Sequence, residues 1–181
     1  YDFFTSSAVR MIPGIIFMGA LAVPASLMIL FWETDEPKHL SLFDVIKIFF
    51  VGGSLSLLLT FVIHSLITAL SLDGSNVGGY LLMALIVGVS EETAKLIAVY
   101  FFSRKLKDCW ILNGLLIGAI VGTGFAVFET AGYALQSADT LETLRTIIFQ
   151  RGILSVGGHV IWTAIAGAAL MLVQDGGVLK R

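Results

Sequence analysis

Two adjacent carboxylates and a lysine interrupt an apolar run at residues 79–102. Glu91 and Glu92 lie near the middle of this run, and Lys95 follows them by four and three residues. A run of this length predicts a membrane-spanning helix, and ionisable residues inside such a helix usually have a function. Since a helix puts Lys95 on the same side as both carboxylates, it can neutralise at least one of them. The pattern indicates half of a buried hydrolytic site, in which a carboxylate takes a proton from water.

Glu129 and His159 are candidate partners from two later apolar runs. Phe125 precedes Glu129 by one helical turn, and Thr163 follows His159 by one turn. Arg151 begins an i, i+4 series that leads to His159 and should face protein. We therefore predict a catalytic set of Glu91, Glu92, Glu129 and His159, supported by Lys95, Phe125, Thr163 and Arg151.

The adjacent carboxylates cannot share one role, because Glu91 and Glu92 point about 100° apart on a helix. We favour Glu91 as the group that activates water, and we assign Glu92 to holding Lys95 or to packing. The alternative is a purely structural ion pair. Glu129 would orient the water, and His159 would donate a hydrogen bond, together with a threonine one turn on, to the developing oxyanion.

The elements that must position these residues are long apolar helices. Each of five runs is long enough to cross a bilayer, which takes about 20 residues. They are residues 11–32, 43–70, 79–102, 111–135 and 152–173. A backbone in lipid must satisfy its own hydrogen bonds, so we predict an all-α, polytopic transmembrane bundle. His64, in the second run, has no acidic neighbour in sequence and is interpreted as an ordinary core histidine.

The last connection differs from the others. Asp139 and Glu142 have the spacing of a capping box, and Leu141, Leu144 and Ile148 repeat near the helical period. Residues 137–151 therefore predict an amphipathic helix at the membrane interface. An equally weighted alternative makes them the first turns of the fifth span.

The composition is that of an integral membrane protein. Of 181 residues, 57% are hydrophobic and 13% are charged, and the mean hydropathy is +0.93. We expect one membrane domain over residues 1–181, trimmed at its N-terminus because it starts at Tyr1. A net charge of -2 argues against a nucleic-acid partner. A single cysteine, Cys109, excludes an internal disulfide.

Basic residues predict the orientation of the chain. With five spans, one side holds Lys38, Arg104, Lys105, Lys107, Lys180 and Arg181, and the other holds Arg10, Arg145 and Arg151. The richer side is expected in the cytoplasm. The candidate site then lies in the middle to outer part of the membrane, nearer the extracytoplasmic side.

Three ordered motifs resemble those of the PrsW-type intramembrane proteases, which are distantly similar to CAAX prenyl proteases and Abi-type membrane proteins. The motifs are Glu91-Glu92-x-x-Lys95, Phe125-x-x-x-Glu129 and His159-x-x-x-Thr163. Thr130 stands where the family is expected to have asparagine. The resemblance implies hydrolysis of a peptide bond in a membrane-bound protein substrate, in a bacterial cell membrane, as in the family's role on anti-sigma factors.

A metal is the open question in this resemblance, because the family is often described as metalloproteases. If present, a divalent ion such as zinc would be bound by Glu91, Glu92, Glu129 and His159. The His-Glu-x-x-His pattern is absent, and an oxygen-rich set is less typical of zinc. We favour a site that requires no cofactor.

Two other functions fit parts of the pattern. Buried glutamate and histidine also mark the pathways of ion-coupled transporters, although no repeat of the motif helices is evident between the two halves. A non-catalytic membrane scaffold could bind partner helices through small-residue faces such as Gly118-x-x-x-Gly122.

Overall fold

The residues that the structure describes form five continuous helical rods. The computed structural model describes residues 12–34, 40–69, 77–104, 110–137 and 140–174. The single-segment rods are α1 (Ile12–Glu33), α4 (Val77–Ser103) and α5 (Ile111–Ser137). The second rod joins α2 (Leu42–Lys47), the π-helical segment η2 (Ile48–Gly52) and α3 (Gly53–Ala69). The last joins α6 (Leu141–Ser155), the π-helical segment η3 (Val156–Ile161) and α7 (Trp162–Gln174). The all-α prediction is confirmed.

Among the described residues, four helical stretches are long and apolar enough to cross a membrane. They are Gly14–Glu33, Leu42–Thr68, Ile111–Gln136 and Glu142–Gln174. The predicted span at residues 79–102 corresponds to α4, which has 27 residues but contains the three charged residues of the first motif. Its length, about 40 Å at 1.5 Å per residue, would be sufficient to cross. That α4 crosses the membrane stays a prediction.

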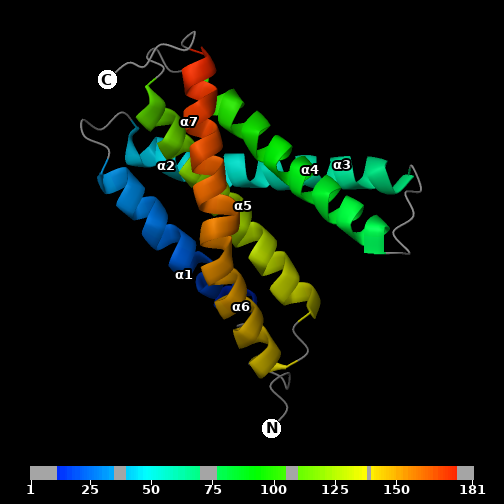
Figure 1. Cartoon of the computed structure of the whole chain (residues 1–181). Coiled ribbons are helices and arrows are strands. Elements are labelled where there is room, and N and C mark those ends of the chain that lie inside the picture. Colours follow the sequence, from blue (N-terminus) through cyan, green and yellow to red (C-terminus); the bar gives the residue numbers. More distant parts are fainter. Residues whose placement is uncertain (1–11, 35–39, 70–76, 105–109, 138–139, 175–181) are drawn as a thin grey trace.

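The last rod decides between the two interpretations of residues 137–151. Thr140 caps α6, and its side chain accepts a hydrogen bond from the backbone N–H of Thr143. Asp139, the predicted cap, lies outside the described residues. From Leu141 the helix continues through η3 into α7, and Figure 1 shows α6 and α7 end to end. Within the described residues 140–174, the connection therefore supplies the first turns of the last helix and is not a helix separate from it.

Helix α5 is the centre of the bundle. Within its apolar window 78% of the residues are buried, against 17–33% in the other three candidate spans. Small residues make this possible: a Cβ atom added at Gly122 would lie 2.6 Å from the backbone oxygen of His159. Gly114 and Gly118 meet the backbone of α7 in the same way. Close backbone approach through these glycines therefore fixes η3 and α7 against α5.

Helices α3 and α4 pack against each other and project to one side of the bundle (Figure 1). They carry large exposed apolar side chains, including Leu58, Leu66, Leu81 and Leu82. Apolar patches of this extent on a helix suit contact with lipid.

Candidate active site

Lys95 is the buried cation of the candidate site. Its side chain is fully buried, and its Nζ donates to Glu92 Oε1 at 2.7 Å and lies 3.8 Å from Glu91 Oε2. A charge this deeply buried is tolerated only when it is paired. The Glu92 side chain is 36% exposed, whereas that of Glu91 is 15% exposed. The two carboxylates therefore occupy different environments, as their angular separation on one helix predicts.

His159 connects α4 to α5. Its Nδ1 lies 2.8 Å from Lys95 Nζ, and its Nε2 lies 3.1 Å from Glu129 Oε2. A lysine ammonium has only donors, so Nδ1 accepts and the neutral ring carries its proton on Nε2. The ring packs against Phe125, with 5.1 Å between centroids, and Lys95 Nζ lies 4.3 Å from the centroid of that phenyl ring. Lysine thus fixes both the tautomer and the orientation of the imidazole.

Glu129 is held by a second cation, from α6. Arg151 donates from its terminal Nη2 to Glu129 Oε2 at 2.5 Å, and its guanidinium lies over the Tyr133 ring at 3.9 Å. One oxygen of Glu129 therefore receives hydrogen bonds from Arg151 and from His159. Charge-assisted bonds of this kind keep a carboxylate in one position.

The segment that carries His159 is not a regular α-helix. His159 lies in η3, a π-helical segment, and such segments occur frequently at functional sites. Thr163, which α-helical spacing puts on the face of His159, is fully buried, and its Oγ1 has no hydrogen-bond partner among the described residues. Its backbone meets Gly118 of α5. The role suggested for Thr163 stays a prediction.

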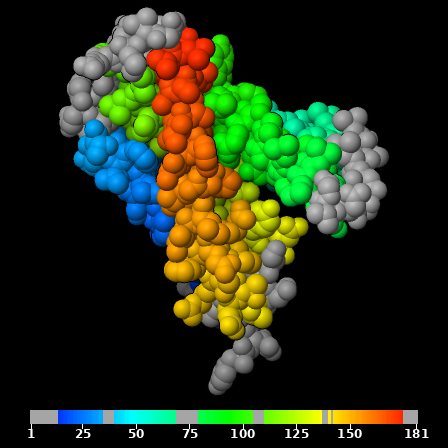
Figure 2. Space-filling view, in the orientation of Figure 1, coloured from blue at the N-terminus to red at the C-terminus, as the bar shows by residue number. Residues whose placement is uncertain are grey.

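Glu91 and Glu129 open onto a cleft of about 650 Å³ between α3, α4 and the end of α5. Figure 2 shows a hollow between α4, in green, and the end of α5, in yellow. Thr60, Phe61 and His64 line the side that α3 contributes. A ligand from outside the bundle can reach the two carboxylates through this cleft.

His64 has a different position from the one that its sequence context suggested. It lines the cleft, and its Nε2 lies 2.9 Å from the Oγ of Ser90, the residue before Glu91. Thr60 precedes it by one helical turn, so both polar side chains share a face of α3. That i, i+4 spacing was the available signal in the sequence. It indicates a polar face but not which helix this face meets.

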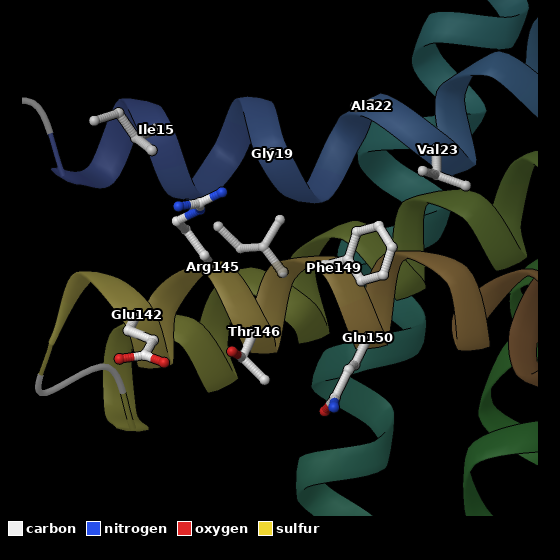
Figure 3. Close-up of a pocket in the computed structure, with 10 residues that line it drawn as sticks. Ile15, Gly19, Ala22, Val23, Glu142, Arg145, Thr146, Phe149 and Gln150 are labelled. Atoms are coloured by element: carbon white, nitrogen blue, oxygen red, sulfur yellow. The ribbon is translucent and has the colours of Figure 1, made fainter.

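A somewhat larger groove, of about 740 Å³, lies between α1 and α6. Figure 3 shows Arg145 extending from α6 toward α1 within it, with Phe149 further along. None of the predicted catalytic residues lines this groove. We therefore place the candidate active site in the smaller cleft, which contains both carboxylates.

The cluster can be tested for its fit to a metal ion. Glu91, Glu129 and His159 each offer one ligand atom, and these atoms lie within 4.8 Å of one another. Two carboxylates and an imidazole suit a divalent ion and leave positions for water. His159 would have to release its Nε2 proton to bind the ion. The three residues fit in number and spacing, whereas Glu92 is bonded to Lys95 and is not one of them.

Comparison with known proteins adds one finding. Residues 41–179 match the model of a protein family described as PrsW family intramembrane metalloprotease. This range includes all three charged motifs and the cleft. Neither the curated proteins nor the solved structures yield a match to the chain.

Proposed function

The chain belongs to the PrsW family of intramembrane metalloproteases and is therefore a peptidase, and we propose that Glu91 activates the water that cleaves its substrate. The observation that carries this proposal is the meeting of three helices at one cleft. Glu91 and Glu129 both line it, and His159 Nε2 lies 3.1 Å from Glu129. Acid, base and hydrogen-bond donor are then within reach of one peptide bond.

In the proposed reaction, Glu91 takes a proton from water and the resulting hydroxide attacks the carbonyl carbon of the substrate. The protonated carboxyl then gives its proton to the departing amine as the C–N bond breaks. Glu129, held by Arg151, orients the attacking water. The Nε2–H of His159 shifts its hydrogen bond from Glu129 to the oxyanion, and a site with little water strengthens this bond. Lys95 acts indirectly: its contact with Nδ1 keeps the ring proton of His159 on Nε2.

A divalent ion held by Glu91, Glu129 and His159 would polarise the carbonyl and lower the pKa of bound water. We favour a reaction driven by the carboxylates, because Lys95 already supplies a positive charge 3.8 Å from Glu91. A chelator followed by zinc tests this preference. Unchanged cleavage is expected, whereas loss with the chelator and recovery with zinc would contradict it.

The substrate we propose is a membrane-associated protein, in keeping with the four apolar stretches that make this chain an integral membrane protein. The cleft lies among helices whose outer faces suit lipid, so a membrane helix can reach it sideways. By the distribution of basic residues we further propose that the cleft opens nearer the extracytoplasmic side of a bacterial membrane. Cleavage of an anti-sigma factor would be one use of such a site.

The test uses the full chain in liposomes with a fluorogenic reporter that has a single Leu/Ala membrane helix. Glu91→Gln and Glu129→Gln should each lower the cleavage rate at least 100-fold, because a positioned base contributes about that much. Glu142→Gln is the matched control, since this residue lines only the groove between α1 and α6. Equal cleavage by all variants would overturn the mechanism. Ion flux that Glu91→Gln abolishes, with no cleavage in any variant, would favour the transporter instead.

A further inference from the structure

Thr60 carries a hydroxyl that the fold does not use. Its side chain is 5% exposed, and its Oγ1 has no hydrogen-bond partner among the described residues. Other hydroxyls on helices α3 and α4 bond back to their own helix: Thr68 donates to the carbonyl of His64 at 2.9 Å, and Thr93 to that of Val89 at 2.7 Å. A buried polar group without a partner is unfavourable, so the hydroxyl of Thr60 is available to a group that enters from outside the fold.

Thr60 is one of the residues that line the cleft containing Glu91 and Glu129, and its hydroxyl is buried behind that surface. One turn along the same face of α3 is His64, fixed by its contact with Ser90 Oγ at 2.9 Å. Most of the remaining lining from α3 and α5 is apolar or aromatic, including Leu57, Phe61, Phe128 and Tyr133. The cleft therefore combines an apolar interior with a few polar atoms, which is typical of a binding site.

Peptide hydrolysis in a membrane creates a need for such a polar atom. In a helical substrate the carbonyl and N–H groups are bonded to each other, so a segment must unwind before water can attack it. In lipid each group freed by unwinding is costly unless it finds a new partner. A hydroxyl can donate to a carbonyl or accept from an N–H, so it recognises main chain and not a particular side chain.

We propose that Thr60 binds the main chain of an unwound substrate segment lying in the cleft, opposite Glu91 and Glu129. This inference rests on the proposed peptidase function and adds the conformation in which the substrate is bound. Thr60 is a binding residue that stabilises the extended segment, while the carboxylates perform the reaction.

Gly132 marks the space that this segment would fill. It lines the cleft one turn after Glu129, and a Cβ atom added there would have no atom within 4 Å. A Cβ atom at this position would touch no part of the fold, so we expect a larger side chain there to occupy the cleft. Gly88 of α4 has equally open surroundings but does not line the cleft, so it provides a matched control.

The first experiment compares Thr60→Val with Thr60→Ser in liposomes, using a single-span Leu/Ala reporter with a central Gly-Gly pair. Thr60→Val should lower kcat/KM about tenfold and leave the melting temperature unchanged or raised, because the lost hydroxyl bonds nothing in the free protein. Thr60→Ser should recover most of the activity. Thr68→Val, on the same helix but outside the cleft, should cleave as the parent does. Equal kcat/KM for Thr60→Val and the parent would overturn the inference.

The second experiment uses Gly132→Leu and Gly88→Leu. Gly132→Leu should lose at least 90% of cleavage with a melting temperature equal to or above that of the parent, and Gly88→Leu should keep full cleavage with a melting temperature in the same range. Full cleavage by Gly132→Leu would overturn the placement of the substrate.

Binding in a Glu91→Gln background separates this inference from the proposed function. The same reporter, labelled with a fluorophore, should bind Glu91→Gln. Adding Thr60→Val to this variant should weaken binding and raise the Kd of the reporter about tenfold. If the parent cleaves no reporter but this difference in Kd is found, the proposed function fails and the substrate-binding role of Thr60 stands. If the parent cleaves but Thr60→Val changes neither Kd nor kcat/KM, the role of Thr60 alone fails.

Discussion

The two sides of α5 show how one helix can be closed to ligands on one face and open on another. On the closed side a Cβ atom at Gly122 would lie 2.6 Å from the backbone oxygen of His159, so the helices touch through their backbones. On the open side, a Cβ atom at Gly132 would have no atom within 4 Å, and this residue lines the cleft. The closed side fixes the histidine, and the open side leaves a cleft beside Glu129, where we propose that the substrate binds. A glycine in the sequence does not reveal which of these it serves.

The largest effect is expected at Lys95 of α4, which contacts His159 on the closed side and lies 3.8 Å from Glu91 in the cleft. Lys95→Met removes the partner of Glu92 and of His159 Nδ1 and leaves two partly exposed carboxylates without their buried cation. Because the carboxylates retain some contact with solvent, we expect a cost of up to about 3 kcal/mol, so thermal unfolding should occur below the parent temperature and cleavage should be lost. A parent-like melting curve would show that Lys95 does not hold the two sides together. Lys47→Met is the control, since this lysine lies at the end of α2, away from the cluster.

The same substitution, glycine to alanine, should change the stability of the protein in opposite directions on the two sides of α5. Gly122→Ala forces the backbone of η3 away from α5 and should destabilise the protein by about 1–3 kcal/mol. Gly132→Ala meets no neighbour and should stabilise it by about 0.5 kcal/mol, because alanine favours the helix. Denaturation in detergent micelles measures both. Changes of the same sign would break the distinction between the two sides of α5.

A smaller effect is expected at Arg151, on the rim of the open side. Arg151→Lys keeps the charge but loses the planar group that stacks on Tyr133 while bonding Glu129. We expect kcat to fall roughly fivefold with little change in KM, since about 1 kcal/mol of orientation is lost in a partly exposed position. Steady-state kinetics with the single-span reporter separates the two constants. A change confined to KM would assign Arg151 to substrate binding instead.

The structural features that depend on composition and on spacing along a single helix could be predicted from the sequence. Apolar runs identified the long helices, and i, i+3 spacing predicted the contact of Lys95 with Glu92. The meeting of Glu91, Glu129 and His159 was predicted because buried charges need partners, with three motifs that resemble a known family. These predictions would hold for any packing of the helices that pairs the same buried charges.

Features that depend on rotation and register were not predictable in this way. Whether Thr60 and His64 face Glu91 depends on how α3 is rotated against α4, and both polar faces exist in either case. The π-helical turn at His159 arises where η3 packs closely on Gly122, and local sequence does not encode it. The same limit applied to α6, whose continuity with α7 depends on tertiary packing.

The most direct test of the account compares single-turnover cleavage by Glu91→Gln and Glu92→Gln in liposomes. The two substitutions are chemically identical and adjacent, but only Glu91 lines the cleft, while Glu92 bonds Lys95 at 2.7 Å. A glutamine at position 92 can still accept from Lys95, so its effect should be much the smaller. The account predicts that Glu91→Gln lowers the rate at least 100-fold and at least tenfold more than Glu92→Gln does. Equal losses, or a greater loss in Glu92→Gln, would contradict it.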